Sequence, residues 1–335
     1  MDSLSQLALG AAVSVAAHGR GTRVWKSALW GAIAGTLPDL DVLIDHGDPV
    51  SNMVLHRAES HAFFWQTLAA PLLAWTACRV HGEARRFGRW LVAVWLAFVT
   101  HAVLDAFTVY GTRLWLPFRD DPVALGSVFI IDPLYTLPLV VGLLVALRRS
   151  AARGAVLANA WGLALSSAYL AWTLAAQALV TERALDALRA QGLPHERVLV
   201  TPTPFNSILW RVVALEEQRY HEGFVGLLDG SRPPRFDAFP REPALLAALP
   251  GPSAARLAEF AGGFVRATES DGIARVADLR MGQEPGYVFE FALARRVGGV
   301  LEPLAPVSVG ERGDFGAALR WIGVRMLGRD VPPPR

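Results

Sequence analysis

"LVAVWLAFVTHAVLDAF" spans residues 91–107 and places two ionisable side chains inside an apolar segment. A helix that crosses a bilayer needs about 20 apolar residues, and residues 90–109 meet that length. His101 and Asp105 are four residues apart, so they lie on one face of a helix, and Thr108 continues that face. Because ionisable groups are costly inside a bilayer, this pair marks a candidate functional site.

The composition is typical of a membrane protein. The chain of 335 residues is 53% hydrophobic and 19% charged, with a mean hydropathy of +0.32. Its eleven Trp residues favour the same class, because indole rings prefer the boundary between water and lipid. The net charge of +2 is too small to indicate a nucleic-acid partner. We therefore expect a lipid bilayer, and no nucleic acid, as the partner of this chain.

Apolar segments cluster in the first 180 residues and predict a mainly α, polytopic bundle of five to six transmembrane helices. They cover roughly residues 4–17, 27–44, 62–80, 90–109, 128–147 and 155–180. The first is shorter than about 17 residues, so it is either re-entrant or interfacial if it does not span. After residue 180 charged residues and prolines become frequent. The sequence therefore predicts a transmembrane helical domain over 1–180 and a smaller extramembrane α+β domain over 181–335.

The second domain has a pattern typical of an antiparallel sheet with helices on one face. Strands are expected at 196–200, 209–215, 221–228, 274–280 and 287–294. Helical spacing follows in "EPALLAALP" (242–250) and "SAARLAEFAGGFVRA" (253–267). The final "VPPPR" (331–335) is expected to be frayed.

Basic residues in the short loops predict the orientation in the membrane. One set of alternate loops carries nine of them: Arg20, Arg23, Lys26, Arg85, Arg86, Arg89, Arg148, Arg149 and Arg153. The opposite loops hold only Arg57, Arg113 and Arg119. Since cytoplasmic loops are enriched in Lys and Arg, the first set is expected to face the cytoplasm. We predict an inner-membrane protein whose polar motifs and C-terminal domain lie on the extracytoplasmic side.

The pair His101 and Asp105 has two interpretations. An imidazole nitrogen and a carboxylate oxygen on adjacent helical turns can reach one divalent metal ion. Alternatively, a hydrogen bond between the two side chains stabilises the interior of a bundle. The pair alone leaves both interpretations open.

Two further carboxylates lie in "GTLPDLDVLIDHGD" (35–48), where Asp39 and Asp41 follow Pro38. Proline disrupts a helix, and at membrane depth this is tolerated mainly beside a cavity or a protein partner. The alternative is that the motif is an ordinary polar helix end. We predict that Asp39 and Asp41 belong to a site.

Histidines precede the next apolar segment, in "LHRAESHAFF" (55–64). His56 and His61 fall on the same predicted side as the acids described above. Together these residues match a mononuclear or binuclear metal site, in which carboxylates bridge ions and neutral imidazoles complete the ligand set. The predicted metal ligands are Asp39, Asp41, His56, His61, His101 and Asp105.

Two residues are predicted to take part in catalysis. Asp41, if not fully used in coordination, can accept a proton as a general base. Arg57 can hold an anionic substrate group such as phosphate, or it can neutralise a neighbouring carboxylate. Asp132 in "IIDPLY" is either a helix cap or a residue that orients a ligand.

The order of the motifs resembles a known family. "PDLD", "HRAESH" and "THAVLDAFTVYGTRLWLPF", separated by apolar segments, resemble the YdjM-like family of membrane-bound proteins described as metal-dependent hydrolases. The motifs are more distantly similar to those of zinc-dependent phospholipase C and P1-type nucleases. That similarity implies His61, His101 and Asp105 as zinc ligands and Asp39 or Asp41 as a bridging carboxylate.

We therefore expect a membrane-bound hydrolase that uses Zn²⁺, or Mn²⁺, to activate water against a phosphoester or lipid-linked substrate. The alternative is a non-enzymatic membrane protein that binds a divalent cation or recruits a partner through its C-terminal domain. Intramembrane His and Asp residues also mark ion pathways, so the composition of the site does not separate the two.

Overall fold

The computed structural model describes residues 1–19, 21–149, 154–310 and 314–335, and its contacts form two compact units. The helical unit comprises Met1–Leu43, Arg57–Leu174 and Pro204–Asn206. The sheet unit comprises Ile44–His56, Ala175–Thr203 and Ser207–Arg335. Arg20 and Arg153, which contribute to the predicted orientation, lie outside the described residues.

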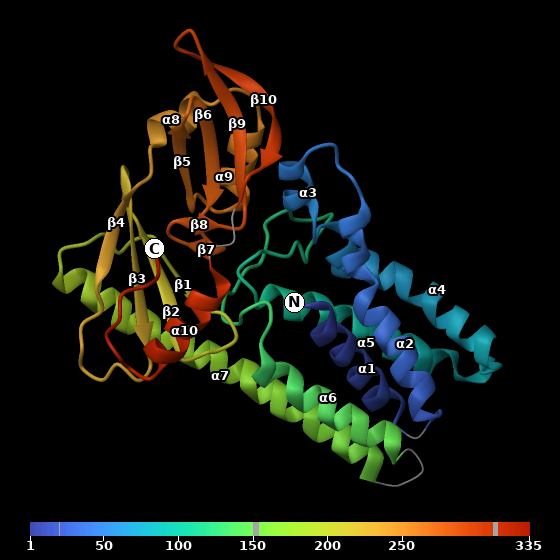
Figure 1. The fold of residues 1–335 in the computed structure, drawn as a ribbon. Coiled ribbons are helices and arrows are strands. Elements are labelled where there is room, and N and C mark those ends of the chain that lie inside the picture. Colours follow the sequence, from blue (N-terminus) through green and yellow to red (C-terminus); the bar gives the residue numbers. More distant parts are fainter. Residues whose placement is uncertain (20, 150–153, 311–313) are drawn as a thin grey trace. The chain divides into compact units, whose positions relative to one another are not determined.

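The helical unit packs α1 against α2, α5 and α6, and α4 against α5 (Figure 1). Its helices are α1 (Ser3–His18), α2 (Val24–Thr36), α4 (Phe63–His81), α5 (Phe87–Ala106), α6 (Pro133–Arg148) and the first part of α7 (Gly154–Ala190). Trp90 and Phe98 of α5 pack on buried alanines of α4. Small residues on one helix thus receive large rings from the other, which gives the dense packing of a protein core.

Glycines bring α1 and α2 into close contact. A Cβ atom added to Gly10 would lie 2.3 Å from the carbonyl oxygen of Gly31 and 2.7 Å from the Cα of Gly35. Small residues four apart on one helix allow this backbone approach, as they do in membrane proteins. The contact fixes the end of α2, where the chain enters the segment that carries Asp39.

The predicted bundle of five to six transmembrane helices is not confirmed. Among the described residues, two helices are long and apolar enough to cross a membrane, at Ala84–Ala106 and Val156–Ala190. Helices α1, α2 and α6 have 16, 13 and 16 residues, below the length of about 20 that a span needs. The physical cause lies in their ends. Helix α2 gives way to a 3₁₀ turn beginning at Pro38, and Asp132 caps α6 by accepting a hydrogen bond from the amide of Leu134.

Short elements connect α2 to α4. They are the 3₁₀ turn η1 (Pro38–Leu43), helix α3 (Pro49–Leu55) and the 3₁₀ turn η2 (Glu59–His61). Helix α3 belongs to the sheet unit, where it packs on α9 (Ser253–Phe260) and β10 (Val300–Ser308). Between α3 and η2, Arg57 adopts a left-handed backbone conformation with a φ of 63°. This conformation is rare for a residue other than glycine, and it lies four residues before His61.

The sheet unit contains two four-stranded antiparallel sheets, ordered β1-β2-β3-β4 and β10-β9-β6-β5 (Figure 1). The strands are β1 (Val198–Pro202), β2 (Leu209–Leu215), β3 (Arg219–Gly226), β4 (Phe236–Pro240), β5 (Val265–Ser270), β6 (Ile273–Asp278), β7 (Gly282–Gln283), β8 (Gly286–Tyr287), β9 (Glu290–Val297) and β10 (Val300–Ser308). The helices are α8 (Pro243–Ala248), α9 (Ser253–Phe260), α10 (Phe315–Met326) and the last part of α7. Val213 of the first sheet and Ala277 of the second share one apolar cluster.

The helical N-terminal part and the β-sheet C-terminal part are confirmed. Helix α7 continues through residue 181, and the division of the chain at 180/181 stays a prediction. The helix expected over 253–267 is partly wrong, because α9 ends at Phe260 and β5 begins at Val265. Gly262 and Gly263 both have positive φ angles, a conformation that ends helices.

Candidate metal centre

Helix α5 carries two of the predicted ligands on its last turns. His101 and Asp105 are both fully buried, and the His101 Nε2 atom lies 3.4 Å from the Asp105 Oδ2 atom. They share one face of the helix because of their spacing of four residues. The sequence-based expectation for their relative placement is therefore met.

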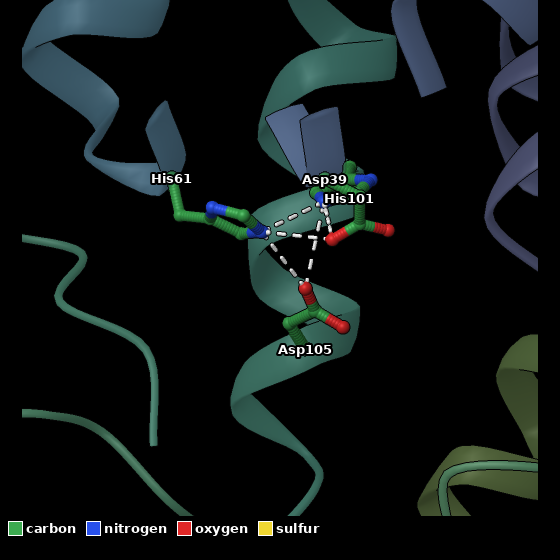
Figure 2. Close-up of side chains that lie close together, drawn as sticks. All are labelled: Asp39, His61, His101 and Asp105. Atoms are coloured by element: carbon green, nitrogen blue, oxygen red, sulfur yellow. Dashed lines mark hydrogen bonds and ion pairs between the residues drawn. The ribbon is translucent and has the colours of Figure 1, made fainter. Parts of the chain in front are cut away.

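Two further side chains reach this face from η1 and η2. The His61 Nε2 atom lies 3.0 Å from His101 Nε2, 3.1 Å from Asp105 Oδ2 and 3.3 Å from Asp39 Oδ1. Figure 2 shows the four side chains converging on one point. One ligand atom from each of Asp39, His61, His101 and Asp105 lies within 4.8 Å of the others. We refer to these four residues as the Asp–His cluster.

A backbone carbonyl determines which nitrogen of His101 faces the cluster. The Nδ1 atom lies 2.7 Å from the carbonyl oxygen of Gly35, the glycine that packs closely against α1. A carbonyl oxygen only accepts hydrogen bonds, so Nδ1 carries the proton and donates it. The Nε2 atom then presents a lone pair to the cluster, which is the form that binds metal.

A hydroxyl and a carboxylate impose the same form on His61. Ser60 donates its hydroxyl hydrogen to Asp41 Oδ2 at 2.5 Å, so its oxygen is left to accept from His61 Nδ1 at 2.8 Å. Such indirect carboxylate–histidine contacts orient metal ligands in proteins. The Nε2 atom of His61 therefore also presents a lone pair to the cluster.

The ligand atoms of the Asp–His cluster are of the kinds that bind a cation. Two imidazole nitrogens and two carboxylate oxygens face one another, and the buried Asp105 Oδ2 atom lies 3.1 Å from His61 Nε2 and 3.4 Å from His101 Nε2. Burial lowers the pKa of the His61 imidazole. The carboxylates of Asp105 and Asp39 raise it by a larger amount, so the pKa lies above its ordinary value. Burial raises the pKa of the Asp39 carboxyl, but the two imidazoles lower it more, so this group is ionised. Without an ion, a proton on His61 therefore supplies positive charge beside the carboxylates, and a bound divalent ion would supply it instead.

The second oxygen of Asp105 is held by other groups. Its Oδ1 atom contacts the Met1 amino group, accepts a hydrogen bond from Gln6 Nε2 at 3.0 Å, and lies 3.4 Å from Arg57 Nη2. These contacts fix the carboxylate plane. They leave Oδ2 directed at the two imidazoles.

Arg57 lies beside the cluster and is only 3% exposed. Its Nη1 atom donates to Thr108 Oγ1 at 3.0 Å, and its guanidinium lies 4.9 Å from the centre of the Tyr110 ring. The proximity to Asp105 supports the predicted neutralising role. The predicted contact with an anionic substrate stays a prediction.

Asp41 and His56 are not among the four residues whose ligand atoms converge. Asp41 accepts hydrogen bonds from Ser60 and from the backbone amide of Arg57, at 3.0 Å for the amide. His56 caps the C-terminal end of α3 in the sheet unit, and its side chain is half-buried. In a 3₁₀ turn, successive side chains are about 120° apart, so Asp39 and Asp41 point in different directions from η1.

Ser60, Gly35 and Gln6 were not predicted as site residues. Ser60 adjoins His61 in the sequence, and a hydroxyl next to a ligand is a usable signal. The role of the Gly35 carbonyl could not be predicted from the sequence, because every residue has a backbone carbonyl. Its position depends on the packing of α1 against α2. Gln6 is a polar residue within an apolar segment, and this position could have indicated a role in the site.

Comparison with known proteins places the chain in a family. The family model described as YdjM inner membrane protein matches residues 1–180, which include all four residues of the Asp–His cluster. No curated protein and no solved structure matches the chain. The family description names a location and no reaction. Because the match covers more than half of the 335 residues, the chain belongs to the YdjM inner membrane protein family.

Proposed function

We propose that this protein is a membrane-bound, metal-dependent hydrolase whose Asp–His cluster holds one divalent ion. The observation that carries the proposal is the convergence of two imidazole nitrogens and two carboxylate oxygens, one from each of four residues, within 4.8 Å of one another. Two nitrogen and two oxygen donors suit Zn²⁺ first and Mn²⁺ second. Four ligand atoms around one point support one ion rather than two.

A divalent ion at this place would act as a Lewis acid and lower the pKa of coordinated water from about 15.7 to about 7. The protein's own contribution is orientation. Gly35 and Ser60 fix the two imidazoles, and Gln6 fixes Asp105. We assign Asp41 to positioning His61 through Ser60, in place of the base role that the sequence suggested.

Asp39 lies on the open side of the cluster. Its side chain is 21% exposed, whereas His61, His101 and Asp105 are fully buried. A substrate therefore reaches the cluster past Asp39. A carboxylate at this position is placed to accept the proton of an attacking water, provided that one of its oxygens is free of the ion.

The surroundings favour a phosphoester on a lipid. Arg57 supplies positive charge next to Asp105, which suits a phosphate group. Beside Asp39, the η1 residues Leu40, Val42 and Leu43 expose most of their apolar side chains. The cluster also lies at the end of the candidate span Ala84–Ala106, the level at which lipid headgroups begin. An amphiphile with a phosphate and an acyl or prenyl chain matches both features.

The basic residues of the sequence further support an extracytoplasmic position for the cluster and for the C-terminal domain. Alkaline phosphatase fused after Arg335 is expected to be active, and green fluorescent protein at the same point is expected to be dark. The opposite pattern contradicts this orientation.

The decisive experiment measures metal first and reaction second. Purified wild-type protein is expected to contain stoichiometric Zn or Mn by elemental analysis, and His101→Ala and Asp105→Ala are expected to lose it. Asp45→Asn, an exposed acid outside the cluster, is the matched control and is expected to keep it. Absence of metal from folded wild-type protein disproves the proposal.

Metal-dependent release of phosphate or headgroup from a panel of phospholipids and prenyl phosphates then tests the reaction. Activity is expected in wild type, with loss in His101→Ala and retention in Asp45→Asn. Stoichiometric metal without hydrolysis of any member of the panel would favour the alternative, a membrane protein that binds a cation without catalysis.

A further inference from the structure

Two acidic side chains face each other directly in the sheet unit. Glu222 of β3 and Asp237 of β4 are cross-strand partners in the antiparallel register. Like charges directly opposite on adjacent strands destabilise a sheet. A cation between them removes this repulsion, so the pair marks a place where a positive group binds.

Arg335 supplies that positive group. Its Nη1 atom lies 2.7 Å from Glu222 Oε1, and its Nη2 atom lies 2.7 Å from Asp237 Oδ2. The guanidinium also lies 4.6 Å from the centre of the Phe239 ring, two residues along β4 and on the same face as Asp237. Two carboxylates and an aromatic face form a site specific for a planar cation, because a guanidinium donates to both acids and stacks on the ring.

The carboxylates and guanidinium groups around this place balance in charge only when Arg335 is present. Glu222 Oε2 is paired with Arg211, and Glu284 is paired with Arg266. Asp237 has no ion-pair partner other than Arg335 among the described residues. Without the Arg335 guanidinium, three carboxylates face only the two guanidinium groups of Arg211 and Arg266. One negative charge is then not compensated.

The segment that delivers Arg335 is bound along its length, which corrects the expectation that residues 331–335 are frayed. The indole of Trp321 donates to the carbonyl oxygen of Val331 at 3.0 Å, and Gln283 donates to the carbonyl oxygen of Pro334 at 3.4 Å. The three successive prolines Pro332, Pro333 and Pro334 favour an extended conformation with low conformational entropy. Aromatic-lined grooves recognise proline-rich segments because such segments are already extended before they bind.

The guanidinium site is open to other ligands. A cavity of about 610 Å³ lies beside Arg335 and is lined by Phe236, Phe239 and Pro285 among others. The side chain of Arg335 is 31% exposed and that of Asp237 is 60% exposed. The Arg335–Asp237 pair is exposed and contributes little to stability, whereas Glu222 is fully buried, so a competing guanidinium has to replace mainly the contact with Glu222.

We propose that this groove on β3 and β4 is a peptide-recognition site for an arginine that follows an extended proline-rich segment, and that residues 331–335 occupy it in cis. The site lies in the sheet unit and is independent of the Asp–His cluster. The partner that it fits is a protein segment with arginine after prolines.

The test uses the full chain with residues 331–335 deleted, in detergent or nanodiscs, and a fluorescent N-acetyl-VPPPR peptide as the probe. Fluorescence polarisation is expected to show saturable binding to the deleted chain. Binding to wild type is expected to be at least about tenfold weaker, because the tethered segment competes at high effective concentration. VPPPK is expected to bind about tenfold more weakly than VPPPR, since lysine cannot bridge both carboxylates.

Asp237→Asn in the deleted chain is expected to weaken VPPPR binding by about tenfold. Glu269→Gln, which breaks an ion pair with Arg296 elsewhere in the sheet unit, is the control and is expected to leave it unchanged. If VPPPR fails to bind the deleted chain, or if VPPPK binds equally well, the groove is no recognition site.

Arg335→Ala is a second test variant for the case in which the deleted chain misfolds. It keeps residues 331–334 and removes only the guanidinium. Methylguanidinium at millimolar concentration is expected to raise the melting temperature of this variant, and methylammonium is not. Equal effects of the two ions on the variant would overturn the proposal.

Discussion

The Nε2 atoms of His61 and His101 lie 3.0 Å apart, and the Nδ1 atom of each ring is held by a separate group. At this distance the two nitrogens either share a proton or bind a common cation. The surrounding protein holds them together through Ser60 on one side and Gly35 on the other. The arrangement is therefore preorganised for a cation, because the ligands are oriented before the ion arrives.

Removing the contact that orients His61 should weaken metal binding without abolishing it. Ser60→Ala leaves all four ligands in place but removes the acceptor for His61 Nδ1. We expect metal affinity to fall by about 10- to 100-fold, the usual effect of losing such a contact. Competition with a zinc-sensitive dye measures the change, and Asp41→Asn should act in the same direction. Glu59→Gln, an exposed neighbour in η2, should have no effect; an equal loss there would mean that the turn, not the hydroxyl, matters.

The close contact of α1 and α2 should matter for both stability and metal binding. A Cβ atom at position 35 would lie 2.5 Å from the carbonyl oxygen of Gln6. Gly35→Ala must therefore separate the helices, at a cost of about 1–3 kcal/mol, and move the carbonyl away from His101. Thermal unfolding and the dye assay measure the two effects. Gly88→Ala in α5 meets no neighbouring atom and should be neutral or slightly stabilising.

Substitution of Arg57 separates its two predicted roles. If the guanidinium helps to bind a substrate phosphate, Arg57→Gln should keep stoichiometric metal and weaken inhibition by inorganic phosphate by about tenfold. We expect this result, measured as the phosphate inhibition constant of the hydrolase reaction. Unchanged inhibition together with altered metal affinity would restrict Arg57 to neutralising Asp105.

An ion pair in the sheet unit should make stability depend on pH. Asp229 accepts hydrogen bonds from Arg325, at 2.6 Å for Nη2, and from the amide of Gly226 at 2.7 Å. Burial raises the pKa of its carboxyl, but these partners lower it more, so the folded-state pKa lies below the ordinary value. The resulting stabilisation is present above the unfolded-state pKa of about 3.9 and is lost as the pH falls through the folded-state pKa.

Asp229→Asn should therefore lower stability by about 3 kcal/mol at neutral pH, because Arg325 is left buried without its charged partner. The difference from wild type should shrink as the pH drops below about 4. Melting temperatures of both proteins from pH 7 downward test this. A difference that stays constant with pH would show that the carboxylate charge does not contribute.

The sequence predicted the part of the site that a regular helix determines. His101 and Asp105 obey the spacing of α5, and their shared face followed from that spacing alone. Asp39 and His61 were correctly brought to the same region. The separation of Asp39 from Asp41 could not be predicted, because it depends on η1 being a 3₁₀ turn. The left-handed backbone conformation of Arg57 could likewise not be predicted, because arginine rarely adopts it.

The predicted number of spans is not confirmed, and apolar composition alone does not define helix length. Residues 27–44 are apolar, but α2 ends at Thr36 ahead of Pro38. Residues 128–147 are apolar, but α6 begins only after the cap at Asp132. In the sheet unit, β2 formed at the expected 209–215, where a nearly continuous apolar run that is buried throughout is bounded by turns. Residues 331–335 lack apolar periodicity, so the sequence did not predict that they bind to the sheet unit through Trp321 and Arg335.

The Asp–His cluster draws its ligands from η1, η2 and α5, two of which are single short turns. An ion bound there would cross-link these segments and stabilise the fold by about 2.7 kcal/mol at a free concentration one hundred times its dissociation constant. Metal starvation would then loosen residues 37–62 and expose them to proteases. The cellular lifetime of this protein would follow the supply of its metal.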